Sequence, residues 1–201
     1  MKSLKFLVTG IMMFGATAIY AQNEADNTTD RTASLGVKGG VNFSNVSGDD
    51  IGDTESRTNF HVGLVGELPL ADIFSLQAEV LYSGQGFDVK NPVLLGADEA
   101  TYKLDYINVP VLAKVYLFKG FSLEAGPQFS FKVNEKIEID GEESDEQDEA
   151  EDFDFGVAAG ATFQTEMGLF AYGRYNYGFT DVVKDTDIRN AVFQIGIGYK
   201  F

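Results

Sequence analysis

Apolar and polar residues alternate along the chain from Ser34 onward, with the period of two that is typical of β-strands. Over positions 193–201, large apolar residues occupy every second position, and Gln, Gly or Lys fills the positions between them. The stretches 121–133 and 153–165 show the same alternation. The pattern predicts eight strands, at 34–44, 58–69, 73–87, 101–117, 121–133, 153–165, 169–179 and 190–201.

The predicted strands are long, and their connections alternate in length. Each strand has at least the ~9–11 residues that a tilted strand needs to cross a bilayer, whereas strands of globular proteins average ~5–6 residues. Tight turns follow the second, fourth and sixth strands, and longer connections follow the others, at 45–57, 88–100, 134–152 and 180–189. Short turns opposite long loops are typical of outer-membrane barrels. We therefore predict an all-β fold, an eight-stranded antiparallel up-and-down transmembrane β-barrel.

Alternation alone leaves two orientations open for the apolar face. It can point into a soluble, lipocalin-like ligand-binding barrel, or outward into lipid. The polar face is rich in Gly, Ala and Ser, whereas a solvated exterior would carry more Lys, Glu and Thr. Aromatic residues also gather near the predicted strand ends, where they can form interfacial girdles. They are Phe43, Tyr82, Tyr102, Phe129, Phe153, Tyr175 and Phe179 at one end, and Phe74, Phe118, Phe121, Tyr199 and Phe201 at the other. Both features favour lipid on the apolar side.

Residues 1–21 have the features of a secretory signal peptide. Two lysines precede an apolar run at 6–19, and Ala21 provides a small residue for cleavage. The run is too short to span ~30 Å of hydrocarbon as a helix. Residues 22–33 are polar and predict a flexible periplasmic spacer, so that the barrel domain occupies 34–201. Export and the barrel together predict a location in the outer membrane, with both termini in the periplasm.

The chain carries a formal net charge of −16 and contains no Cys. Nucleic-acid partners are therefore excluded, because phosphate recognition requires a basic field. Without Cys, disulfides, thiolate metal sites and Cys nucleophiles are excluded as well. Acidic residues concentrate in the loop 134–152, where a solvated, self-repelling loop and a site for divalent cations are both open interpretations. The weak candidates for surface cation binding are Glu142, Glu143, Asp145 and Asp148.

The polar face of the predicted strands carries charges of both signs. An eight-stranded barrel has an interior just wide enough for its own side chains, and charges there must be paired and hydrogen-bonded. His61 and Asp154 are also predicted on this face. If the side chains do not fill the lumen, the alternative is a narrow gated pore, which opens when an ion pair such as Glu79–Lys114 breaks. We expect an ion-pair network in the lumen, formed by Lys38, Glu67, Glu79, Lys114, Glu124, Lys132, Arg174 and Lys200.

His61 is the single histidine, and it is predicted on the polar face of the second strand. A Ser nucleophile with a His base would make an outer-membrane lipid-modifying enzyme, and Ser44 or Ser83 could supply the hydroxyl. Such a site would need to reach the outer rim, so we predict no enzymatic activity, no catalytic residues and no cofactor. Pro110 and Pro127 each remove a main-chain donor within a predicted strand, and we expect a bulge at each.

Four segments resemble the signature strands of the small outer-membrane β-barrel domain family, the porin-family and OmpA- and OmpX-like eight-stranded barrels of Gram-negative bacteria. They are 36–44 (GVKGGVNFS), 75–83 (SLQAEVLYS), 106–114 (YINVPVLAK) and 123–129 (LEAGPQF). The resemblance covers essentially all of the mature chain and implies an eight-stranded outer-membrane barrel without a common catalytic activity. The terminal Phe201 resembles the signal read by the barrel-assembly machinery. Outer-membrane lipid and lipopolysaccharide are the other expected partners.

The function predicted from these features is a structural or surface-interaction scaffold that acts through its acidic extracellular loops. A small porin, or a channel for ions and solutes, is the alternative from another class. A lipid-modifying enzyme and a soluble lipocalin-like barrel are the remaining alternatives. Single-channel conductance separates the scaffold from the pore, because a filled lumen gives no conductance steps.

Overall fold

The computed structural model of the chain describes residues 31–47, 54–90, 99–139, 142–144, 151–181 and 189–201. The described residues form nine strands: β1 (Ser34–Ser47), β2 (Thr54–Ala71), β3 (Phe74–Lys90), β4 (Glu99–Phe118), β5 (Phe121–Ile139), β6 (Glu142–Ser144), β7 (Phe153–Gln164), β8 (Leu169–Asp181) and β9 (Arg189–Lys200). None of the described residues forms a helix that is long and apolar enough to cross a membrane.

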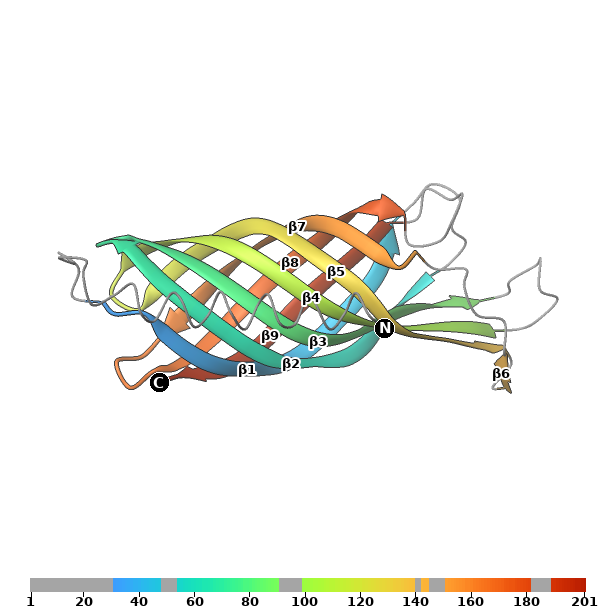
Figure 1. The fold of residues 1–201 in the computed structure, drawn as a ribbon. Helices are drawn as coiled ribbons and strands as arrows, with labels where there is room; N and C mark the ends of the chain where they lie inside the picture. Colours follow the sequence, from blue (N-terminus) through green and yellow to red (C-terminus); the bar gives the residue numbers. More distant parts are fainter. Residues whose placement is uncertain (1–30, 48–53, 91–98, 140–141, 145–150, 182–188) are drawn as a thin grey trace.

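Eight of these strands close into a barrel (Figure 1). All ladders are antiparallel; β5 pairs with β7, and β1 pairs with β9 to complete the ring. The short strand β6 adds to the edge of β5 outside the ring. The predicted eight-stranded antiparallel up-and-down barrel is therefore confirmed, with β1 to β5 and β7 to β9 as its strands. Most of the strands are longer than predicted, above all β2, which begins at Thr54, and β5, which runs to Ile139.

The two ends of the barrel differ in their connections. At one end, which we call the short-turn end, two residues join β2 to β3 and β4 to β5, and four residues join β7 to β8. Gly120 and Gly168 in these turns have φ angles of 81° and 89°, which residues with a side chain rarely adopt. Lys119 and Glu166 form an exposed ion pair between two of the turns. Their hydrogen bond raises the pKa of Lys119 and lowers the pKa of Glu166.

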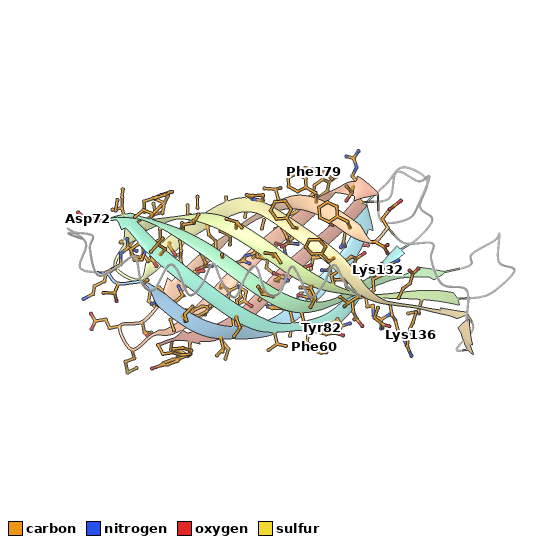
Figure 2. The ribbon with its side chains drawn as sticks, viewed as in Figure 1. Phe60, Asp72, Tyr82, Lys132, Lys136 and Phe179 are labelled. Carbon is orange, nitrogen blue, oxygen red and sulfur yellow. The ribbon has the colours of Figure 1, made fainter. Side chains whose placement is uncertain are left out.

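At the opposite end, the long-loop end, β3, β4 and β5 continue beyond the ring, with β6 at their tip (Figure 1). The β4–β5 ladder runs as far as Ala100 and Ile139. Its register shifts between Asp105 and Tyr106, and such a bulge bends the strand and increases its twist. Figure 2 shows Lys136 on this extension. The side chains of this extension therefore lie beyond the end of the closed barrel.

Pro110 and Pro127 are accommodated without the predicted bulges. The β4–β5 register is constant from Val109 to Ala113, across Pro110, and the β5–β7 register is constant along its length, across Pro127. A proline removes one ladder hydrogen bond but adds no residue to its strand, so no shift in register is required. The prediction of bulges at these two positions is wrong.

The barrel is polar inside and apolar outside. Among the described residues, 23 polar or charged side chains are buried, against nine apolar ones. Large apolar side chains face outward, among them Leu64 and Ile197, which are 63% and 65% exposed. Phe60 and Tyr82 pack against each other on this exterior, with ring centroids 5.8 Å apart (Figure 2). This distribution is the reverse of that in a soluble barrel and points the apolar face outward.

Aromatic side chains contact one another toward both ends of the apolar exterior. Phe155 packs against Phe129 and Phe179, with ring centroids 5.4 Å and 6.1 Å apart, and Figure 2 shows Phe179 toward the long-loop end. Tyr199 and Phe201 pack 6.4 Å apart at the short-turn end. Groups of this kind are typical of the two interfacial girdles of a membrane barrel.

Candidate functional site

A cluster of four charged side chains lies across the barrel interior. Arg174 of β8 donates to Glu79 of β3 through Nη1 (2.8 Å) and Nη2 (2.7 Å). It also donates to Glu124 of β5 through Nε (3.0 Å) and Nη2 (2.6 Å). Lys38 of β1 donates to both carboxylate oxygens of Glu79, at 3.1 and 3.2 Å. We call these four residues the Arg174 cluster. Because β3 and β8 lie on opposite sides of the ring, the cluster spans the interior.

The Arg174 cluster is buried, neutral and fully hydrogen-bonded at its carboxylates. Its four side chains are at most 1% exposed, and two cations face two carboxylates. Gln77 donates a further hydrogen bond to Glu79 at 2.7 Å, and Thr162 donates to Glu124 at 3.2 Å. All four carboxylate oxygens therefore accept hydrogen bonds. Buried charges require this degree of pairing, because each has lost its contact with water.

Neighbouring residues shape the space around the cluster. Arg174 and Tyr172 share the interior face of β8, because successive side chains of a strand point to opposite faces. Gly160 lies opposite Arg174 in the β7–β8 ladder, and a Cβ there would come within 3.1 Å of the Arg174 Cβ. The Nζ of Lys38 lies 3.6 Å from the centroid of the Tyr172 ring, which adds a cation–π interaction.

A second charged cluster lies nearer the short-turn end. Lys114 and Lys200 both donate to Oε2 of Glu67, the former at 3.2 Å. The Tyr116 hydroxyl donates to Oε1 of Glu67 at 2.5 Å, and Nη1 of Arg31 lies 3.8 Å from the same oxygen. We call Arg31, Glu67, Lys114 and Lys200 the Glu67 cluster. Three cations converge there on one carboxylate.

Arg31 precedes β1 and ties the N-terminal segment across the short-turn end. Its Nη2 donates to the main-chain oxygens of Ala71 and Asp72, at 2.9 and 2.8 Å, and its Nη1 donates to Ser75 at 3.3 Å. The guanidinium carbon lies 3.9 Å from the centroid of the Tyr116 ring. Asp72 marks this end in Figure 2. Sequence reasoning assigned Arg31 to the polar spacer and had no signal for these contacts.

The pair Glu79–Lys114, which the sequence offered as a gate, is not formed among the described residues. Lys114 lies opposite Ser75 in the β3–β4 ladder, four residues before Glu79 along β3. Lys114 pairs instead with Glu67, whereas Glu79 belongs to the Arg174 cluster. Although the two residues lie on adjacent strands, the strand register places them four residues apart, so their side chains do not pair.

His61 is 1% exposed inside the barrel and bonds to an amide and a phenol. Its Nδ1 lies 2.6 Å from Oδ1 of Asn42, and its Nε2 is hydrogen-bonded to the Tyr172 hydroxyl. The Asn42 amide nitrogen donates to Ser83, which leaves Oδ1 as the acceptor and makes His61 Nδ1 the donor. Among the described hydrogen bonds, neither Ser44 nor Ser83 bonds to His61. The Ser–His pair of the enzyme hypothesis is therefore not assembled.

The other two charged residues predicted on the lumen face, Lys132 and Asp154, lie toward the long-loop end, where Figure 2 shows Lys132. Nζ of Lys132 contacts Oε2 of Glu135 at 2.6 Å and Oδ1 of Asp152 at 3.4 Å. Asp154 accepts a hydrogen bond from the Thr180 hydroxyl. Lys132 therefore stands apart from both clusters, at the opening of the barrel.

The candidate cation ligands fall in and beside β6. Glu142 and Glu143 belong to this strand by their backbone, whereas Asp145 and Asp148 lie outside the described residues. In the part of the chain that the structure describes, no group of three or more His, Cys, Asp or Glu residues is arranged to hold a metal ion. Cation binding by the loop stays a prediction.

Sequence reasoning missed two interior residues that complete the Arg174 cluster. Gln77 bonds to Glu79, and Tyr172 underlies Lys38. Each lies two positions from a charged residue that the alternation had placed inside: Gln77 from Glu79, and Tyr172 from Arg174. Because residues two positions apart on a strand share a face, the sequence could have predicted that Gln77 and Tyr172 also point into the barrel.

The geometry combines a closed ring of strands, a polar interior filled with bonded charges and an apolar exterior, as expected of a barrel that sits in a lipid bilayer. The family model described as outer membrane protein beta-barrel domain matches residues 20–184. The chain belongs to this family of outer-membrane proteins. A comparison with curated proteins finds no match.

Several solved outer-membrane proteins share the fold. The attachment invasion locus protein Ail of Yersinia pestis is 15% identical, with a TM-score of 0.53 over 85% of this chain and 100% of Ail. Neisserial surface protein A is 17% identical, with a TM-score of 0.54 over 85% of this chain and 100% of that protein. OprG of Pseudomonas aeruginosa is 13% identical, with a TM-score of 0.52 over 88% and 99% of the two chains. At these identities the likeness shows the fold alone.

Proposed function

We propose that this protein is a non-enzymatic scaffold of the outer membrane, which holds acidic loops at the cell surface for interaction with partners. Residues 1–21 serve as the signal peptide, the short-turn end faces the periplasm, and the long-loop end faces outward, as in other barrels with this distribution of turns. The apolar exterior contacts outer-membrane lipid and lipopolysaccharide. The barrel-assembly machinery recognises β9, on which Phe193, Ile195 and Ile197 form an exposed apolar row.

The observation that carries the scaffold function is the Arg174 cluster. Its side chains are at most 1% exposed, and they bond to one another across the ring. Side chains that lined an open aqueous pore would keep contact with water and would show larger exposed fractions. The packing of the cluster therefore supports a filled lumen over the alternative of a small porin.

The charge of the loops indicates what kind of partner the surface accepts. From Glu135 to Asp154 the sequence holds 12 acidic residues and one Lys. Ail has been solved in complex with the heparin analogue sucrose octasulfate, which is a polyanion. The acidic loop of this chain would repel such a ligand. We therefore assign a partner with a basic surface, or an anionic one bridged by divalent cations held at Glu142, Glu143, Asp145 and Asp148.

The binding test uses the purified protein in phospholipid vesicles and a lysine-rich peptide as the probe. Neutralising Glu142, Glu143, Asp145 and Asp148 to Gln and Asn should weaken binding of the peptide and flatten its dependence on salt. The matched control neutralises Asp72 and Glu166, two exposed acidic residues of the short-turn end, and should leave binding from the outer side unchanged. Equal binding by all three proteins contradicts the assignment of the loop.

Single-channel recording in planar bilayers tests the filled lumen. The unmodified protein should give no conductance steps. Regular steps in the unmodified protein would instead establish the alternative of a small pore. The same preparation should migrate faster on a gel when unboiled, which shows that the barrel was closed during the recording.

A further inference from the structure

The short-turn end of the barrel holds a site whose shape fits a guanidinium group, and Arg31 occupies it. Nη2 of Arg31 donates to the main-chain oxygens of Ala71 and Asp72, at 2.9 and 2.8 Å. Nη1 donates to Oγ of Ser75 at 3.3 Å and lies 3.8 Å from a carboxylate oxygen of Glu67. These acceptors face a planar fork of N–H donors, which a lysine does not have. We call this arrangement the Arg31 site.

The ring of Tyr116 forms the apolar wall of the Arg31 site. The guanidinium carbon lies 3.9 Å from the ring centroid, which adds a cation–π interaction. The Tyr116 hydroxyl donates to Glu67 at 2.5 Å, so the aromatic wall and the carboxylate of the site hold each other in place. Ser75 and Glu67 are themselves buried. The strands therefore preorganise the site, and the guanidinium comes from outside them.

The segment that carries Arg31 crosses the opening of the ring. Arg31 lies before β1, which begins at Ser34, whereas its partners lie in the β2–β3 turn, β3 and β4. In the ring, β2 and β3 separate β1 from β4. The contact with Tyr116 therefore runs across the opening and does not follow a ladder. The Arg31 side chain is 29% exposed, as expected of a group that closes the rim from outside.

The contacts of Arg31 depend on strands that are already in place. Its hydrogen bonds join residues 40 to 44 positions apart in the chain, and none of them belongs to a strand ladder. Contacts of this kind form late, because the chain between the two partners must be ordered first. An interaction that is absent from the transition state slows unfolding and leaves the folding rate unchanged.

Glu67 links the Arg31 site to the last strand of the barrel. Lys200 of β9 donates to Oε2 of Glu67, on the other side of the carboxylate from Arg31. The main-chain N–H of Phe201 donates to the oxygen of Leu35 at 2.9 Å, close to the segment that bears Arg31. The N-terminal segment and the C-terminal strand are therefore both attached to one carboxylate.

We propose that Arg31 is a clamp, which docks into the Arg31 site after the strands have closed and keeps the barrel from unfolding at its short-turn end. Its occupant must be a planar cation that can stack on the ring of Tyr116 and donate to the two main-chain oxygens at the same time. An ammonium group carries the charge but not this geometry. The residue that precedes β1 thereby contributes to the lifetime of the folded barrel.

The test compares the rates of unfolding and refolding of the protein in phospholipid vesicles. Urea starts unfolding, dilution of urea starts refolding, and the folded fraction is read from unboiled gel migration. Arg31→Met should unfold about tenfold faster than the unmodified protein, because charge-assisted hydrogen bonds that form late are lost. Its refolding rate should not change. An unchanged unfolding rate overturns the proposal, and so does refolding that slows by the same factor.

Two further variants separate the guanidinium site from a general effect of charge. Arg31→Lys keeps the positive charge and should unfold nearly as fast as Arg31→Met. Lys119→Met is the matched control, because it removes an exposed cation of the same end, and it should unfold at the rate of the unmodified protein. If Arg31→Lys unfolds as slowly as the unmodified protein, or if Lys119→Met unfolds as fast as Arg31→Met, charge alone accounts for the effect and the clamp is refuted.

Discussion

Replacing Arg174 by Met is expected to destabilise the barrel far more than the loss of an exposed charge. The substitution removes four hydrogen bonds to Glu79 and Glu124 and leaves Lys38 as the remaining cation of the cluster. Removing one partner of a buried ion pair costs ~3–5 kcal/mol, whereas exposed pairs contribute ~0–1 kcal/mol. The Arg174 side chain is 1% exposed, so the buried value applies. Met fills much of the space of the arginine stem, which keeps the cavity contribution small.

The assay is urea-induced unfolding of the protein in lipid vesicles, with the folded fraction read from unboiled gel migration. Arg174→Met should lower the free energy of unfolding by ~3–5 kcal/mol. Adding Glu124→Gln should recover part of this loss, because Lys38 and Glu79 then remain as a balanced pair. A loss of less than ~1 kcal/mol in the single variant, or no recovery in the double variant, would refute the reasoning.

Four further substitutions are predicted in the same assay. Tyr172→Phe removes the hydroxyl that bonds to His61 and should cost ~1–3 kcal/mol, because a buried ring nitrogen loses its partner; no loss would mean that water replaces the hydroxyl. Gly168→Ala should cost more than ~1 kcal/mol, since φ is 89° and the new Cβ meets a main-chain oxygen of β9. Gly173→Ala, with nothing within 4 Å of the new Cβ, should be near neutral, so equal losses would contradict the steric argument. Leu64→Lys places a charge on the apolar exterior and should cost ~2–4 kcal/mol in vesicles.

The strands and their faces could be predicted from the sequence because one face of each is apolar and the other is polar. With a side-chain period of two, a slip of one residue would turn every apolar side chain inward. The lengths of β2 and β5 at the long-loop end were underestimated, because the prediction depended on the alternation of apolar and polar residues. Beyond 133, acidic residues interrupt the alternation of β5, yet its backbone stays paired with β4 to Ile139. Ladder hydrogen bonds do not require apolar side chains.

The partners of the interior charges could not be predicted, because they depend on the stagger around the closed ring. Arg174 bonds to Glu79, which is 95 residues earlier in the chain and on the opposite side of the ring. The alternation placed both residues inside the barrel, but it did not indicate the position of either residue along the barrel axis. Arg31 lies before the first strand, where no alternation exists to assign a direction to its side chain.

The β1–β9 ladder has a consequence for the order of assembly. It joins residues 36–47 to residues 189–200, whereas the other ladders of the ring join strands that follow one another in sequence, with only β6 intervening between β5 and β7. Contacts between distant parts of a chain form late, because a long loop must close first. Gly40 lies opposite Gly196 in this ladder, and a Cβ on Gly196 would meet the Tyr172 phenol. Strand glycines weaken pairing, so we expect this join to be the last to form and the first to part.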